Sequence, residues 1–272
     1  MIIDFHTHVY PDRIAARTIQ TLHDVSGLVA CADGTLAGLH QEMRESGTDV
    51  SVVLPVMTKP SQFATINKTA ARINEEGGGM ISFGGIHPDT EDVRKAVRKI
   101  RQLGLPGIKL HPEYQHAYFD DIRYLRILDA AAEEGLLVVT HAGFDPVSPD
   151  VCHCTSKEIL HVLQEVEGCR LVLAHFGGLK RWDEVERDIA GAPVWLDVSF
   201  LPWIPQDQFL RIAARHGLDK LLFASDWPWE KQADVLNCLN ALPLPEEDRE
   251  RIRAGNAVQL LGKRVEACLM KK

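Results

Sequence analysis

Short apolar runs alternate with longer amphipathic stretches along most of the chain. The runs are rich in valine, isoleucine and leucine, which favours buried strands. In the longer stretches apolar residues recur at helical spacing, as Leu36, Leu39 and Met43 do. The pattern predicts strands at 1–9, 49–55, 80–86, 107–111, 136–141, 170–175, 193–198 and 220–225, and helices at 11–22, 35–45, 62–75, 90–103, 121–134, 155–165, 182–190, 206–216 and 231–242.

This order of elements, in which every strand is followed by a helix, is typical of a (β/α)8 TIM barrel. An open doubly wound sheet has a similar rhythm, but a Rossmann domain needs a glycine-rich turn after its first strand, and this chain has His6-Thr7-His8 there. No change in composition divides the chain. We therefore expect a single α/β domain over residues 1–272, with a C-terminal helical cap at 245–261.

Composition narrows the range of functions. The 272 residues carry a formal net charge of -8, which argues against a nucleic acid or an anionic membrane as partner. The opening residues do not form a leader, no apolar run is long enough to span a membrane, and the six cysteines suggest no disulfide framework. We expect a cytoplasmic protein that binds a small-molecule substrate and that could form a homo-oligomer.

Residues able to bind a metal or an anion stand at the ends of five predicted strands. Strands of a parallel barrel open on one face, so these side chains are expected to converge although they lie far apart in the sequence. Histidine and carboxylate side chains together favour a divalent cation. The residues are His6 and His8, Lys109 and His111, His141, His175, and Asp226.

Five motifs at these strand ends resemble the amidohydrolase superfamily, specifically its amidohydrolase-2 branch, which also contains relatives of aminocarboxymuconate-semialdehyde decarboxylase. The resemblance covers the whole chain. The motifs are DFHTH at 4–8, GIKLHP at 107–112, THAG at 140–143, LAHFGG at 173–178 and FASDWP at 223–228.

The resemblance implies a ligand set for one divalent metal, formed by His6, His8, His141 and Asp226. It also implies that His175 holds the metal-bound water or the polarised group of the substrate. Zn²⁺ is the expected ion and Mn²⁺ the alternative. Such an ion lowers the pKa of its water toward ~7, and the second oxygen of Asp226 can accept the proton as general base.

Lys109 leaves the number of metals open. Some amidohydrolases carry a carboxylated lysine on this strand that bridges two metals. The alternative, which we favour, is an ammonium group that binds a substrate carboxylate, with His111 on the same face of the strand. Trp227 is expected to form an aromatic wall of the substrate pocket, and core packing is the alternative for this side chain.

Three functions remain open at this stage. The first is metal-dependent hydrolysis of a small amide, lactone or ester, and the second is non-oxidative decarboxylation of an unsaturated or aromatic acid. The third is a non-catalytic metal-binding barrel, which predicts an incomplete ligand set. Because the set is complete in this sequence, we expect an enzyme, and we rank hydrolysis first.

Overall fold

The computed structural model describes residues 1–271, and its strands form the predicted parallel barrel. Two sheets have the orders β1-β2-β3 and β4-β5-β6-β7-β8-β9, and every pair is parallel. β3 and β4 are two parts of the third barrel strand, interrupted at Phe83. The strands are β1 (Ile3–Thr7), β2 (Val50–Val53), β3 (Met80–Ser82), β4 (Gly84–Gly85), β5 (Gly107–Leu110), β6 (Leu137–Thr140), β7 (Arg170–Leu173), β8 (Trp195–Asp197) and β9 (Leu221–Leu222).

Backbone hydrogen bonds join the first strand to the last. The amide of Phe5 donates to the Phe223 carbonyl at 2.8 Å, and the amide of Asp226 donates to the His6 carbonyl at 2.8 Å. The segment after β9 therefore continues the eighth strand position alongside β1. These contacts place Asp226 beside His6, although the two residues come from opposite ends of the barrel sequence.

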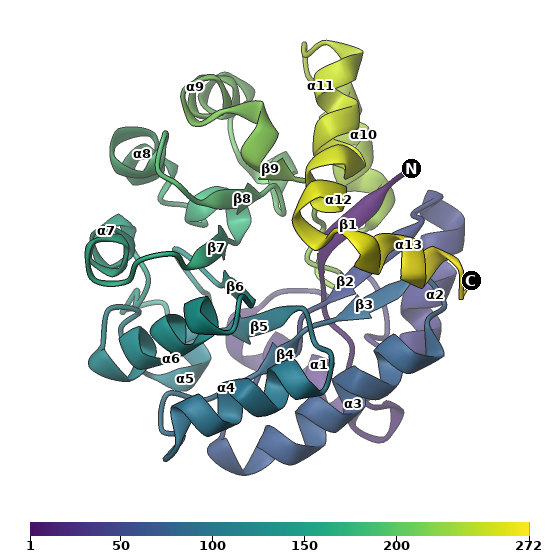
Figure 1. Cartoon of the computed structure of the whole chain (residues 1–272). Coiled ribbons are helices and arrows are strands. Elements are labelled where there is room, and N and C mark those ends of the chain that lie inside the picture. The colour runs from purple at the N-terminus through teal and green to yellow at the C-terminus, as the bar shows by residue number, and fades with distance from the viewer. Residues whose placement is uncertain (272) are drawn as a thin grey trace.

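Helices surround the strands, and α12 and α13 lie across β1, β2 and β3 (Figure 1). Helix α13 lies beyond the predicted cap at 245–261, and π-helical turns at Val185–Ile189 and Arg251–Gly255 interrupt two predicted helices. The helices are α1 (Asp12–Ser26), α2 (Leu36–Ser46), α3 (Phe63–Glu76), α4 (Val93–Gln102), α5 (Pro112–Gln115), α6 (Ile122–Glu133), α7 (Ser156–Glu165), α8 (Trp182–Glu184), α9 (Gln206–His216), α10 (Gln232–Ala241), α11 (Glu246–Glu250), α12 (Asn256–Leu261) and α13 (Lys263–Leu269).

Side-chain caps define where several helices begin. Thr155 and Glu158 form a capping box at the start of α7, which satisfies amide groups that have no partner within the helix. Asp92 caps α4 by accepting from the Lys95 amide. The sequence pattern predicts that this helix begins at Thr90, three residues before Val93, because it does not identify Asp92 as the cap.

Apolar side chains form two main layers. One lies between the barrel and the outer helices and includes Ile108, Leu110 and Leu173. The other contains the alternate residues of the strands, such as Val139, together with apolar residues of the C-terminal helices, such as Leu261. The described C-terminal helices thus close one end of the barrel, and the metal-ligand candidates lie at the other end.

Strand β1 is irregular at the point where its histidines begin. Its register against β2 shifts between Asp4 and Thr7. Phe5 packs in the inner layer, with its ring 6.0 Å from that of Phe83. The shift allows His6, the next residue, to enter the barrel as well, so that simple alternation does not describe this strand.

The Asp4 side chain links the first and last strands of the barrel by hydrogen bonds. Its Oδ1 accepts from the amides of His6 and Ser225, each at 3.0 Å. Its Oδ2 accepts from the Ser225 hydroxyl at 2.5 Å and from Gln232 Nε2 at 2.9 Å. Both Asp4 oxygens are therefore surrounded by donors, and both neighbouring segments carry candidate metal ligands.

The substitution Asp4→Asn is expected to lower the free energy of unfolding by about 1–3 kcal/mol, because an amide NH2 would face donors without an acceptor. Urea unfolding followed by circular dichroism measures this change. Asp24→Asn, at an exposed position of α1, is the matched control and should leave the midpoint unchanged. Equal stability of the two variants would contradict the role given to Asp4.

Among residues 1–271, no helix has both the length and the apolar character needed to cross a membrane.

Candidate metal centre

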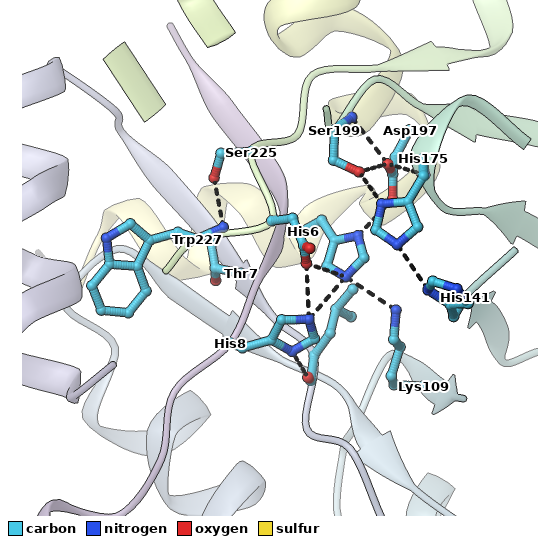
Figure 2. A network of polar contacts seen from close by, with 12 residues as sticks. His6, Thr7, His8, Lys109, His141, His175, Asp197, Ser199, Ser225 and Trp227 are labelled. Carbon is cyan, nitrogen blue, oxygen red and sulfur yellow. Dashed lines mark hydrogen bonds and ion pairs between the residues drawn. The ribbon is translucent and has the colours of Figure 1, made fainter. Parts of the chain in front are cut away.

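Three candidate ligands, His6, His8 and Asp226, meet at the open end of the barrel, and Figure 2 shows the two histidines. The Nε2 atoms of His6 and His8 are 3.1 Å apart. Asp226 Oδ1 lies 3.1 Å from His6 Nε2 and 3.0 Å from His8 Nε2. Ligands held at 2.0–2.2 Å from one ion are themselves roughly 3 Å apart, so the spacing fits a single divalent cation.

The hydrogen bonds of the two histidines show which atoms face the centre. His6 Nδ1 is 2.8 Å from Asp197 Oδ2, and His8 Nδ1 is 2.7 Å from the Leu54 carbonyl oxygen. Both partners are acceptors, so each Nδ1 carries the proton, and each Nε2 of the neutral ring has a lone pair. Asp226 Oδ1 is buried without a hydrogen-bond donor. Three lone-pair atoms therefore converge, which a bound cation would stabilise.

His141 belongs to a neighbouring group with His111 and Asp145. The possible ligand atoms of this group lie within 4.8 Å of one another. The two imidazole rings stack at 4.4 Å, and Asp145 Oδ2 is 3.6 Å from His111 Nε2 and 3.8 Å from His141 Nε2. His141 Nε2 is buried without a hydrogen-bond partner. The three-donor cluster does not include His141, so its place as the fourth ligand stays a prediction.

His175 is held by residues of β8 and of the following turn. Its Nε2 is 2.9 Å from His141 Nδ1, and its Nδ1 is 2.8 Å from the Ser199 hydroxyl. Ser199 in turn donates to Asp197 Oδ1 at 2.5 Å. Both ring nitrogens of His175 thus bond within the chain. The predicted contact of His175 with water or substrate has no support in these contacts.

Lys109 is the buried cation of the site. Its Nζ lies 3.0 Å from His6 Nε2, and its side chain is almost fully enclosed. Burial lowers the pKa of Lys109 to about 8, and the carboxylates of Asp226, Asp197 and Asp145 oppose this shift. The ammonium is therefore the main form at neutral pH in the metal-free site. Lys109 and His111 both line the cavity, as the sequence predicts.

Burial also shifts the pKa values of the histidines and carboxyl groups of the site. Burial lowers the pKa of His6 and of His175 well below the usual value, and lowers the pKa of His141 to about 3. These rings are therefore neutral and able to act as ligands. Burial also raises the pKa of Asp226 and raises that of Asp145 to about 7. A carboxyl group with a raised pKa is a stronger base for proton transfer.

The cavity above the centre has aromatic walls and includes residues that the sequence prediction missed. Tyr114 stacks on His111, with ring centroids 3.9 Å apart. Tyr10, Phe200 and Asp145 were not considered, and all three line the cavity. Asp145 follows the THAG motif by two residues, in a loop where strand alternation gives no information.

Trp227 corrects one sequence prediction. Its side chain is fully buried, packs with residues such as Leu39 and Met43, and does not line the cavity. Figure 2 shows the indole pointing away from the histidines. The reason is the turn at Asp226, after which Trp227 lies against the outer helices while Trp229 reaches the cavity wall.

Two site residues have strained or crowded backbones. Asp226 has a φ of 65°, in the left-handed region that non-glycine residues rarely adopt. Gly143, two residues after His141, has a φ of 86°, and a Cβ there would lie 2.2 Å from the Leu179 amide nitrogen. The backbone that follows β6 and β9 is therefore specialised for this site.

Comparison with known proteins agrees with this arrangement. A family model described as amidohydrolase matches residues 3–263. No curated protein sequence matches the chain. Similar folds occur in solved structures, including three that are each less than 20% identical to this chain. The first is an uncharacterised TIM-barrel protein from Bordetella bronchiseptica, with 19% identity and a TM-score of 0.74 over 97% of this chain and 99% of that chain. The second is a 5-carboxyvanillate decarboxylase from Novosphingobium aromaticivorans with bound manganese, with 15% identity and a TM-score of 0.70 over 96% of this chain and 97% of that chain. The third is a putative 2-pyrone-4,6-dicarboxylic acid hydrolase from Pseudomonas putida, with 18% identity and a TM-score of 0.68 over 96% of this chain and 97% of that chain.

The likeness to these structures supports the barrel fold. The family match extends over nearly the whole chain and includes all five motifs at the strand ends. The three converging donors, His6, His8 and Asp226, lie within that match. The chain therefore belongs to the amidohydrolase family.

Proposed function

We propose that this chain is a metal-dependent hydrolase that acts on a small amide, lactone or ester bearing a carboxylate group. The observation that supports this most is the convergence of three lone-pair donors, from His6, His8 and Asp226, beside the buried cation Lys109. The donors would hold a divalent ion, and the lysine would bind a substrate anion.

A bound divalent ion would supply Lewis acidity and activate water at neutral pH. Two nitrogen donors and one carboxylate suit Zn²⁺. Mn²⁺ is the alternative, supported by the manganese bound in the Novosphingobium decarboxylase. His6 and His8 would hold the ion as neutral rings, oriented by Asp197 and by the Leu54 carbonyl. Asp226 would contribute Oδ1 as ligand, which leaves Oδ2 to accept and return a proton.

The substrate class rests on charge and on shape. Lys109 is the cation among the residues that line the described cavity, and a carboxylate there would gain a charge-assisted hydrogen bond. The aromatic walls from Tyr114, Phe200 and Trp229 suit a flat, unsaturated body. A small unsaturated lactone or ester with one or two carboxylates combines both features.

Decarboxylation of an aromatic or unsaturated acid is the second candidate. The same aromatic walls favour it, as does the similarity to the 5-carboxyvanillate decarboxylase. In this reaction Lys109 would hold a carboxylate, and a carboxyl group such as Asp226 would transfer a proton to the ring carbon. The two candidates share the metal site and differ in what happens to the substrate carbon.

One experiment separates the two reactions. The purified chain, loaded with Zn²⁺ or Mn²⁺, is incubated in ¹⁸O-labelled water with 2-pyrone-4,6-dicarboxylate and, separately, with 5-carboxyvanillate. Hydrolysis opens the lactone, keeps every carbon and adds one labelled oxygen. Decarboxylation releases CO2 and adds one proton to the remaining carbon. Turnover of the pyrone without CO2 release supports the proposal, whereas CO2 release without label uptake contradicts it in favour of the second candidate.

A variant of Lys109 tests whether this side chain binds a carboxylate group of the substrate. Lys109→Met is expected to raise KM for carboxylate substrates by about 10–100-fold, since a charged hydrogen bond contributes about 1.5–3 kcal/mol. The metal content should stay near one ion per chain. Lys180→Met is the matched control, because Lys180 is exposed and lies over the rings of Phe144 and Trp203.

The same variant addresses carboxylation. If Lys109 carries a carbamate that bridges two ions, Lys109→Met should remove at least one of two metals, and ¹³C-bicarbonate should label the wild-type lysine. Two ions per wild-type chain together with that label would replace the ammonium interpretation by a two-metal hydrolase.

A further inference from the structure

We propose that Asp197 is a positioning residue that decides which ring nitrogen carries the proton in His6, His175 and His141. The proposal concerns hydrogen bonds within the chain, and its consequence for metal binding rests on the proposed function. Asp197 ends β8 and is completely buried, and Figure 2 shows it beside Ser199 and His175.

The surroundings of Asp197 identify it as an acceptor. Its Oδ1 accepts from the backbone amides of His175 at 2.9 Å and Ser199 at 3.2 Å, and these groups can only donate. The Ser199 hydroxyl also donates to Oδ1, at 2.5 Å. The remaining oxygen, Oδ2, is 2.8 Å from His6 Nδ1. One buried carboxylate thus has two separate branches of contacts.

The first branch of contacts fixes which ring nitrogen of His6 carries the proton. Because Asp197 Oδ2 accepts, His6 Nδ1 must carry the proton and His6 Nε2 must hold a lone pair. That Nε2 is the atom that lies 3.1 Å from His8 Nε2 and 3.1 Å from Asp226 Oδ1. In Asp197→Asn the amide NH2 would face His6 Nδ1 and favour a proton on Nε2, against the Lys109 ammonium that lies 3.0 Å from that nitrogen. A proton on Nε2 would block the cation position.

The second branch runs through Ser199 and His175 to His141. The Ser199 hydroxyl uses its proton toward Asp197, so its oxygen accepts from His175 Nδ1 at 2.8 Å. His175 Nε2 then has a lone pair and accepts from His141 Nδ1 at 2.9 Å. The remaining nitrogen, His141 Nε2, must therefore also hold a lone pair, and it is buried without a partner.

Two nitrogens on separate strands are thus prepared as ligands by one carboxylate. The proton of His8 is fixed independently of Asp197, by the Leu54 carbonyl, so His8 serves as an internal reference for the other rings. Both ring nitrogens of His175 are used within the chain, so His175 relays this proton order from Asp197 to His141.

Nitrogen NMR of the histidine rings tests the proposal directly. In ¹⁵N-histidine-labelled full-length protein, measured before and after metal removal with a chelator, each neutral ring shows which nitrogen carries the proton. We expect Nδ1–H for His6, His8, His141 and His175 in the metal-free wild type. An Nε2–H form of either His6 or His141 in that sample would overturn the proposal without any variant.

Two variants separate the branches. Asp197→Asn should change the spectra of His6, His175 and His141 but leave His8 at Nδ1–H. Ser199→Ala should change His175 and His141 and leave both His6 and His8 as in the wild type. A purely structural role for Asp197 predicts instead that all four rings change together or that none does, and either result would contradict the proposal.

Zn²⁺ titration measures the consequence for the site. Asp197→Asn is expected to weaken Zn²⁺ affinity by about 10–100-fold, the range found when partners of ligating histidines are removed. If the rings of the wild type have the expected protons but the chain binds no Zn²⁺, the proposed function fails and the proton order stands. If Zn²⁺ binds with wild-type affinity in Asp197→Asn, the role of Asp197 in metal binding is refuted while the proposed function stands.

Discussion

Replacing His6 and His8 together by alanine is expected to abolish metal binding and to reduce turnover by at least about 10³-fold. The two rings supply two of the three converging donor atoms, and a single carboxylate from Asp226 cannot retain the ion. Loss of the ion removes several kcal/mol of transition-state stabilisation. Elemental analysis of the purified variant, grown with zinc or manganese supplied, gives the metal content, and the assay described above gives the rate.

The matched control replaces His23 and His161, two exposed histidines that lie outside the described cavity. This pair should keep both metal and activity, which separates an effect of the site from an effect of histidine number. Full metal occupancy in the His6 and His8 double variant would show that the ion binds elsewhere.

The second large effect is expected from Asp226→Asn. Turnover should fall by at least about 10²-fold, because the amide cannot accept the proton that a general base must take. Asparagine tolerates the left-handed backbone at this position as well as aspartate does, so the fold should be retained. The rate is to be measured with metal in excess and with occupancy confirmed, since Asn is also a weaker ligand.

Asp219→Asn is the corresponding control, at a position in the short helical turn Leu218–Lys220 away from the cavity. It should have wild-type rates. Near-wild-type turnover in Asp226→Asn with a filled metal site would assign the general base to another residue, and Asp145 would be the first to test.

The fold could be predicted from the sequence because barrel strands and helices have distinct apolar periods. The strand from Gly107 to Leu110 and the helix after Asp121 lie where the pattern places them. The observed elements differ from the predicted ones where local backbone geometry, and not the spacing of apolar residues, determines the structure. Residues 80–85 form two short strands because pairing is interrupted at Phe83, and the turn at Val185–Ile189 is π-helical.

The site could be predicted in part. His6, His8, Lys109, His111 and Asp226 converge as expected, because parallel strands end on one face of a barrel. The rest depends on how loops fold over that face.

Loop residues show where the pattern gives no information. Asp145 reaches His111 and His141 from the loop after β6, while Trp227 turns into the core at a residue with positive φ. Neither direction follows from strand alternation.

The hydrogen bonds between β1 and the segment after β9 join parts of the chain that the ribosome makes at very different times. Asp226 follows His6 by 220 residues, so at about 5–20 residues per second the ribosome completes it roughly 10 to 45 s later. During this interval the nascent chain carries two histidines without their carboxylate partner. Loading of the metal is therefore expected to follow synthesis of the chain through Asp226. A circular permutant that begins at the loop after β6 would separate Asp226 from His6 by 52 residues plus the joining linker, and would shorten this interval.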